Sequence, residues 1–150
     1  MKLFKRYSWI LVILMIAFIF VNSMTPAVSS KALSGNITTI ILDGLSSIQV
    51  NMDYEVLHHL IRKLAHFTEY SILGIMVAFA IYERPFIKSK LINFACFFLV
   101  PICDELIQKF TPGRSCEITD MLIDASGMIF GCLILIGIIK LTHHSLSKSK

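Results

Sequence analysis

Two short stretches of this chain combine residue types that can perform acid/base or anion-binding chemistry. The first, residues 62–70, reads RKLAHFTEY and spaces Arg62, His66 and Glu69 at i, i+4 and i+7. This spacing puts the three side chains on one face of a helix. An imidazole near a carboxylate can exchange protons, and a guanidinium can bind a phosphate. The stretch therefore predicts an acid/base or anion site, although a hydrogen bond that only holds helices together would explain His66 and Glu69 equally well.

The second stretch, residues 104–124, reads DELIQKFTPGRSCEITDMLID. Asp104 and Gln108 are one helical turn apart, and so are Asp120 and Asp124. Glu105 follows Asp104 directly, and adjacent side chains on a helix point about 100° apart. These two acids therefore do not form a carboxylate pair by themselves. We expect one of them to face the helix bundle and the other to face a loop or a lipid headgroup.

The sequence TPGRS within this stretch predicts a tight turn, because Pro followed by Gly suits turn positions. Arg114 in the turn could bind a phosphate through two parallel hydrogen bonds. It could equally pair with Asp120 or Glu105. Asp120 precedes an apolar block, so it could also be a simple helix cap.

Long apolar blocks must position these residues. The chain has 150 residues, of which 55% are hydrophobic, and a mean hydropathy of +0.73. This exceeds the apolar content of soluble domains. Four blocks approach the roughly 20 residues that a membrane-spanning helix needs. We expect a single domain over residues 1–150, an all-α integral membrane protein with spans at about 7–22, 64–82, 91–108 and 121–141.

Three features refine this expectation. The first block could also be the apolar part of a signal peptide, but its length and the later spans favour an uncleaved helix. Pro101 lies inside the third block and predicts a kink or break there. Between the first two blocks, apolar residues recur with near-helical spacing. We expect a short extracytoplasmic amphipathic segment at this place, on the membrane surface or capping the bundle.

The distribution of basic residues predicts the orientation. With both termini in the cytoplasm, nine Lys and Arg residues lie inside: Lys2, Lys5, Arg6, Arg84, Lys88, Lys90, Lys140, Lys148 and Lys150. Five lie outside: Lys31, Arg62, Lys63, Lys109 and Arg114. The positive-inside rule favours this N-in, C-in arrangement. The polar residues of both stretches then meet at the extracytoplasmic face.

Two glycines extend the polar face of the last block. Gly127 and Gly131 continue the helical stripe of Asp120 and Asp124. A G-x-x-x-G pair lets another helix approach closely. We expect the stripe to face a helix rather than lipid, and a homodimer through Gly127 and Gly131 is one form that the contact could take.

Several classes of function are not supported. No basic stripe with interleaved aromatic residues appears, so we expect no nucleic-acid partner. The four cysteines lack the spacing of zinc or redox motifs. The acids could bind Mg²⁺ or Ca²⁺, but no compact metal motif is present. The sequence therefore predicts no metal site and no cofactor.

The two stretches resemble the signatures of the VanZ-like family: RKLAHFTEY, and DELIQ followed by a Pro-Gly-Arg turn and a helical Asp and Gly. The order of the spans agrees with that family. The resemblance implies a bacterial membrane protein linked to resistance to teicoplanin-type, lipid-anchored glycopeptides, without implying a reaction. Asp124 departs from the pattern, because the family often has Asn there. By position, the resemblance assigns family residues to Arg62, Lys63, His66, Glu69, Tyr70, Asp104, Glu105, Gln108, Gly113, Arg114 and Asp120.

We therefore expect a multi-pass protein of the bacterial plasma membrane with an outer-leaflet polar site. It would bind or alter an envelope lipid, a lipid-linked envelope precursor or a lipoglycopeptide. The alternative is a membrane-embedded acid/base enzyme acting on a phosphorylated or sugar-linked lipid, and a small transporter ranks third. Candidate catalytic residues are Glu105, His66 and Asp120. Candidate ligand-binding residues are Arg62, Lys63, Glu69, Asp104, Gln108, Arg114 and Asp124.

Overall fold

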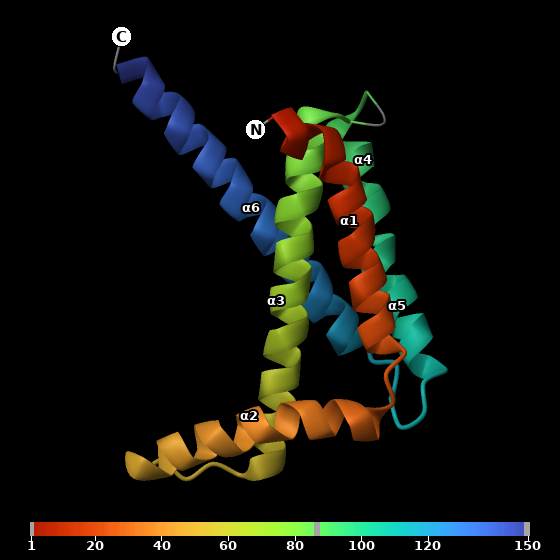
Figure 1. Ribbon diagram of the computed structural model, residues 1–150, viewed down its shortest axis with the longest axis vertical. Coiled ribbons are helices and arrows are strands. Elements are labelled where there is room, and N and C mark those ends of the chain that lie inside the picture. The colour runs from red at the N-terminus through yellow and green to blue at the C-terminus, as the bar shows by residue number, and fades with distance from the viewer. Residues whose placement is uncertain (1, 86–87, 149–150) are drawn as a thin grey trace.

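The computed structural model describes residues 2–85 and 88–148, with the backbone alone at residues 2–6, 30–33, 90 and 143–148. Every element within these residues is a helix, which confirms the all-α prediction (Figure 1). The helices are α1 (Lys2–Ser23), α2 (Ala27–Ser47), α3 (Tyr54–Glu83), α4 (Lys90–Phe97), α5 (Leu99–Lys109) and α6 (Ile118–Lys148).

Within the described residues, three segments are long and apolar enough to cross a membrane: Tyr54–Glu83, Leu91–Lys109 and Ile118–Thr142. A fourth exists if α1 and α2, which meet at 101°, count as one bent span. The chain is thus a multi-pass membrane protein with three or four spans. The second span starts about ten residues earlier than predicted. The Asp53 carboxylate accepts hydrogen bonds from the backbone N–H groups of Glu55 and Val56 and caps α3 before its polar first turns.

The segment after α1 is one helix of 21 residues rather than a short amphipathic piece. Pro26 separates it from α1, with backbone angles φ −55° and ψ 146°. A proline disfavours helical geometry in the residue before it, so α1 cannot continue through Thr25. The chain turns here, and α2 lies across one end of the bundle (Figure 1).

The predicted break at Pro101 is confirmed. The helix is interrupted at Phe98, between α4 and α5. Pro101 has no backbone N–H to donate to the carbonyl of Phe97, four residues earlier. Both helices together form a single candidate span.

The contact between α3 and α6 depends on glycines, as the G-x-x-x-G pattern predicts. A Cβ added at Gly127 would meet the backbone of Phe67, and one at Gly131 would meet the backbone of Ser71. A Cβ at Gly74 would meet Met128 in the same way. The helix that approaches is α3 of the same chain. A homodimer would therefore need a surface other than these two glycines.

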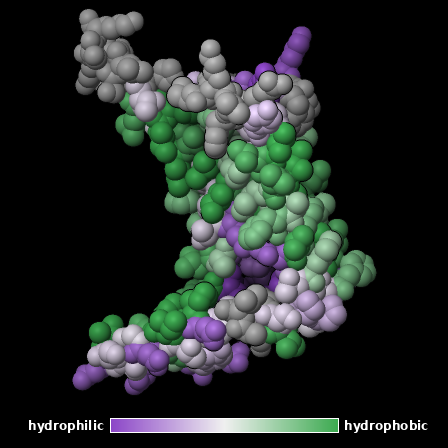
Figure 2. Space-filling view, viewed as in Figure 1, coloured by the Kyte–Doolittle hydropathy of each residue, from purple (hydrophilic) through white to green (hydrophobic). Residues whose placement is uncertain are grey.

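The two ends of the bundle differ in character. The described ends of the chain, at α1 and α6, both lie at the end of the molecule away from α2, with α6 splayed away from the bundle (Figure 1). Figure 2 shows hydrophilic residues gathered in a hollow just above α2, whereas the bundle beyond it is largely hydrophobic. Core residues such as Val12, Leu73 and Val77 fill that apolar part. The site expected from the sequence lies at the α2 end.

Candidate functional site

Three carboxylates are fully buried where α3, α5 and α6 converge. Asp104, Glu105 and Asp124 each expose 0% of their surface. Asp104 and Glu105 come from α5, and Asp124 comes from the second turn of α6. An ionised carboxylate away from water is costly unless hydrogen bonds, cations or a proton compensate it. The partners of each acid therefore show what the site can do.

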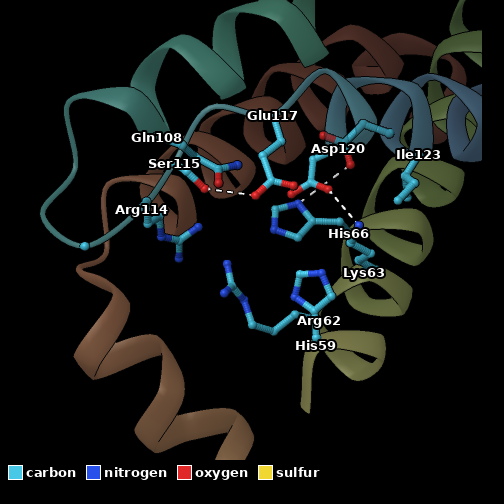
Figure 3. A pocket seen from close by; sticks show the side chains of 12 residues that line it. His59, Arg62, Lys63, His66, Gln108, Arg114, Ser115, Glu117, Asp120 and Ile123 are labelled. Carbon is cyan, nitrogen blue, oxygen red and sulfur yellow. Dashed lines mark hydrogen bonds and ion pairs between the residues drawn. The ribbon is translucent and has the colours of Figure 1, made fainter. Parts of the chain in front are cut away.

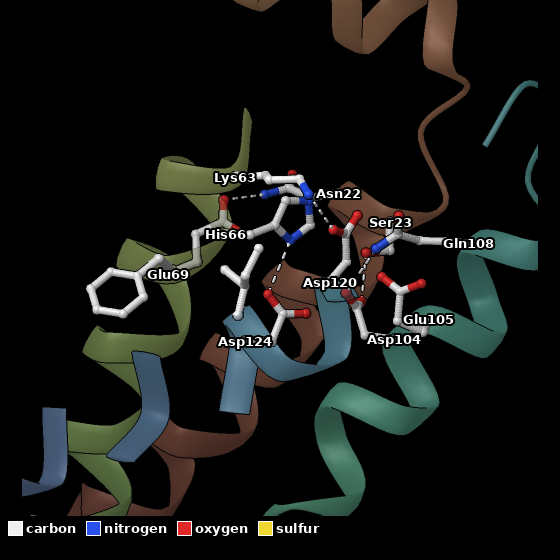
Figure 4. A network of polar contacts seen from close by, with 12 residues as sticks. Asn22, Ser23, Lys63, His66, Glu69, Asp104, Glu105, Gln108, Asp120 and Asp124 are labelled. Carbon is white, nitrogen blue, oxygen red and sulfur yellow. Dashed lines mark hydrogen bonds and ion pairs between the residues drawn. The ribbon is translucent and has the colours of Figure 1, made fainter. Parts of the chain in front are cut away.

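Asp104 is held from two helices. Its Oδ1 accepts a hydrogen bond from the Ser23 hydroxyl at the end of α1, with a distance of 2.5 Å. Its Oδ2 accepts one from the Gln108 amide, one turn later on α5, at 3.1 Å. The predicted proximity of Asp104 and Gln108 is thus observed. The two hydrogen bonds fix the orientation of the carboxylate (Figure 4).

The buried carboxylate of Asp124 has far weaker partners than that of Asp104. Its Oδ1 lies 3.7 Å from Nδ1 of His66, and neither carboxylate oxygen has a hydrogen-bond partner among the described residues. His66 reaches it from α3 (Figure 4). A buried polar group without a partner is rare in folded proteins and calls for an explanation.

Glu105 faces the loop between α5 and α6. Its Oε2 accepts a hydrogen bond from the backbone N–H of Glu117 at 2.9 Å. The expectation that one of the two adjacent acids faces a loop agrees with this contact. Glu105 lines neither of the two cavities described below. Its position favours holding the start of α6 over the acid or base role expected from the sequence.

The remaining predicted residues pair across helices. Nζ of Lys63 lies 3.4 Å from Oδ1 of Asp120, and both side chains are partly exposed. Oε1 of Glu69 accepts a hydrogen bond from the Asn22 amide at 3.2 Å, which ties α3 to the end of α1. These contacts bring both stretches of the sequence to one site.

The Pro-Gly-Arg turn binds the bend between α1 and α2. Gly113 has a positive φ of 75°, which favours glycine. Arg114 donates to the backbone carbonyls of Thr25, at 3.0 Å, and Asn22, at 3.1 Å. It forms these bonds instead of the predicted pairs with Asp120 or Glu105. Burial lowers the pKa of Arg114 from its usual range, and the nearby Arg62 lowers it further.

Two cavities open beside the acids. The first has a volume of about 60 Å³ and is lined mainly by polar side chains. His59 and Arg62 project toward it from α3, and Arg114 projects from the opposite loop (Figure 3). The second, of about 280 Å³, is partly lined by α2 and adds apolar side chains, among them Ile37 and Ile61. Arg62, His66 and Arg114 line both cavities.

Sequence reasoning missed the residues that join α2 to α3. His58 and Thr38 are buried, and Nδ1 of His58 lies 3.1 Å from the Thr38 hydroxyl oxygen. The ring of Tyr54 stacks on His58 with centroids 5.7 Å apart. The only available signal was the pair of adjacent histidines, His58 and His59, in an amphipathic segment. Asn22 and Ser23 gave no signal, because their partners lie far along the chain.

The site thus combines cations, an imidazole and buried acids around two adjacent cavities, the larger of which is partly apolar. Such a site can bind an anionic group attached to an apolar tail, and its His and acids can hold protons or a cation.

Comparison with known proteins agrees with the family expected from the sequence. A family model described as VanZ/LLP1 matches residues 8–140. No curated protein and no solved structure matches the chain. Since the match covers most of its length, the chain belongs to the VanZ/LLP1 family.

Proposed function

We propose that this protein reduces sensitivity to teicoplanin-type lipoglycopeptides by binding an anionic, lipid-bearing molecule at the outer leaflet of the bacterial plasma membrane. The molecule is an envelope lipid, a lipid-linked precursor or the antibiotic itself. The observation that carries the proposal is the pair of adjacent cavities, which share lining residues. Arg62 and Arg114 line both of them, and the larger adds Ile37 and Ile61.

The arrangement suits a headgroup with an attached chain. A guanidinium can bind phosphate or carboxylate oxygens through two parallel hydrogen bonds. Arg114 uses two of its N–H groups on backbone carbonyls, so Arg62 is the better ligand contact. The apolar side chains under α2 would contact the first carbons of the lipid chain. A polar cavity beside a partly apolar one favours an amphiphile over a free ion.

The first test is teicoplanin susceptibility in a sensitive Gram-positive host. It compares wild type, Arg62→Gln and the control Arg84→Gln, which removes an exposed arginine at the far end of α3. We expect protection from wild type and Arg84→Gln at equal membrane abundance, and little from Arg62→Gln. Equal protection by Arg62→Gln would refute the assigned site. A glycopeptide without a lipid tail serves as the comparison drug, and we expect less protection against it.

Direct binding separates the candidate ligands. Purified protein in nanodiscs would be titrated with lipoglycopeptide and, separately, with phosphatidylglycerol against phosphatidylcholine. Preference for the anionic lipid, lost in Arg62→Gln, supports an envelope-lipid ligand. Saturable binding of the antibiotic alone supports direct capture. If neither ligand binds to the protein in nanodiscs more tightly than it binds to nanodiscs without protein, the binding proposal fails.

The second candidate, an acid/base enzyme acting on a phosphorylated or sugar-linked lipid, rests on His66. This imidazole borders both cavities and lies beside the buried Asp124. The test is incubation with labelled envelope lipids, followed by chromatography of the products. A new product formed by wild type but not by His66→Gln would favour the enzyme. If the labelled lipids are unchanged, the enzyme is excluded and the binding function is favoured.

A further inference from the structure

Three potential metal ligands from three helices meet at the floor of the polar cavity. His66 comes from α3, Asp104 from α5 and Asp124 from α6. One ligand atom from each side chain can be chosen so that all three lie within 4.8 Å of one another. The sequence did not predict this group, because the three residues belong to different helices and form no local metal motif.

The burial of the group is the second, independent observation. Asp124 exposes 0% of its surface, and neither of its oxygens has a hydrogen-bond partner in the part of the chain that the structure describes. Nδ1 of His66 also lacks one. Among the described side chains, no Lys or Arg forms an ion pair with Asp104 or Asp124. Two buried carboxylates facing one imidazole leave negative charge that a cation would compensate.

The surroundings are those of a metal site with oriented ligands. Ser23 and Gln108 donate to the two oxygens of Asp104, and each oxygen keeps a second lone pair. Outer partners of this kind fix ligand orientation in metal sites. His66 and Asp124 also line the cavity, so a bound ion would keep an open coordination position toward it.

We propose that His66, Asp104 and Asp124 bind a divalent first-row transition metal ion, with Zn²⁺ as the probe ion. One imidazole nitrogen and two carboxylate oxygens suit such an ion better than Mg²⁺ or Ca²⁺, which prefer oxygen ligands alone. Zinc takes these donors at about 2.0–2.2 Å, which places neighbouring donors about 3–3.6 Å apart. The 3.7 Å between Nδ1 of His66 and Oδ1 of Asp124 is slightly above this range, and the longest separation closes with a side-chain shift of about 1 Å.

The open position deepens the proposed function. An anionic oxygen of the ligand would complete the coordination while Arg62 contacts the rest of the headgroup. This step rests on the proposed function. The metal site itself does not, because it can be measured with the metal alone.

The test uses the full chain purified in detergent with a tag free of histidine, in a His143→Ala, His144→Ala background that removes the tail histidines. The protein is stripped with a chelator, titrated with Zn²⁺ and analysed by elemental mass spectrometry. We expect about one Zn²⁺ per chain. The matched control is Glu117→Gln, which removes an exposed acid that lines the same cavity but lies outside the ligand group.

Asp124→Asn and His66→Gln should each weaken Zn²⁺ binding by about 100-fold or more. Gln108→Leu should weaken it by about 10-fold through the orientation of Asp104. Glu117→Gln should bind Zn²⁺ as wild type does. Stripped wild type that binds no stoichiometric Zn²⁺ would overturn the proposal, and so would zinc retained by both ligand variants or lost from Glu117→Gln.

A spectroscopic measurement guards against variants that do not fold. Co²⁺ bound to wild type should give visible absorption of a tetrahedral or five-coordinate ion, which Zn²⁺ displaces at one equivalent. Only a hexa-aqua Co²⁺ spectrum would contradict the proposal. Displacement by equimolar Mg²⁺ or Ca²⁺ would contradict the choice of a transition metal. If Zn²⁺ binds but no anionic lipid does, the metal site stands and the proposed function fails.

Discussion

The two halves of α3 pack against the rest of the chain by different means. The first half carries Arg62, Lys63, His66 and Glu69 and meets its neighbours through ion pairs and hydrogen bonds. The second half buries apolar residues such as Leu73 and Val77. The backbone contact with α6 at Gly127 and Gly131 lies between them. This difference teaches that the close contact between α3 and α6 sets the distance between these helices at the polar half. The individual ion pairs and hydrogen bonds there are too weak to set it.

The largest effect is expected from breaking the glycine contact between α3 and α6. Gly131→Ala places a Cβ against the backbone carbonyl of Ser71, so α3 and α6 must separate. Overpacking of this kind costs about 1–3 kcal/mol or more. Thermal unfolding in detergent should show a large loss of stability, and the distant polar site should lose its ligand as well.

The matched control is Gly137→Ala on the same helix. An added Cβ there meets nothing within 4 Å, and alanine favours a helix over glycine by up to about 1 kcal/mol. Stability should therefore stay the same or rise. Equal destabilisation by both variants would show that the glycine contact does not set the spacing of the helices.

The next effect tests the polar end. Arg114→Ala removes the hydrogen bonds to the carbonyls of Thr25 and Asn22 and should cost about 2–3 kcal/mol. Arg114→Lys should recover little, because a lysine cannot reproduce the planar fork. Proteolysis at the bend between α1 and α2 should become faster. Lys109→Ala, at an exposed position just before the turn, should leave that rate unchanged.

A smaller effect is expected at α2. Thr38→Val keeps the shape of the side chain but leaves the buried His58 ring without its 3.1 Å partner. The cost should be about 1–2 kcal/mol, read as faster hydrogen exchange in α2 with little change in α6. His59→Ala, at the adjacent exposed histidine, should not change exchange. A uniform rise across all helices would contradict a local role.

The smallest effect on stability separates folding from binding. Lys63→Gln removes a partly exposed ion pair with Asp120, and such pairs contribute about 0–1 kcal/mol. Unfolding should hardly change, while affinity for an anionic lipid should fall several-fold. Lys109→Gln gives a matched loss of charge outside the cavities. A large loss of stability in Lys63→Gln would mean that this lysine holds the polar half together.

The helices and the membrane class could be predicted from the sequence, because hydropathy and proline effects are local. Pro101 predicted the break at Phe98, and the pattern of Gly127 and Gly131 predicted a close helix contact. The length of α2 could not be predicted, since its polar residues gave no clear end signal. The partners of Asp104 could be predicted only in part. Gln108 is one turn away, whereas Ser23 is 81 residues away and no local pattern links the two.

The bonds from Arg114 to the bend between α1 and α2 also bear on biosynthesis. Arg114 and Asn22 are 92 residues apart, and a chain is made from its N-terminus at about 5–20 residues per second. The bend between α1 and α2 therefore lacks its hydrogen bonds from Arg114 for several seconds while the intervening helices are synthesised. During that interval α1 and α2 are exposed to the insertion machinery without their final contacts. The polar end is consequently incomplete until the loop after α5 and the start of α6 have been made, and a chain stalled before residue 114 would carry α1 to α5 without the site.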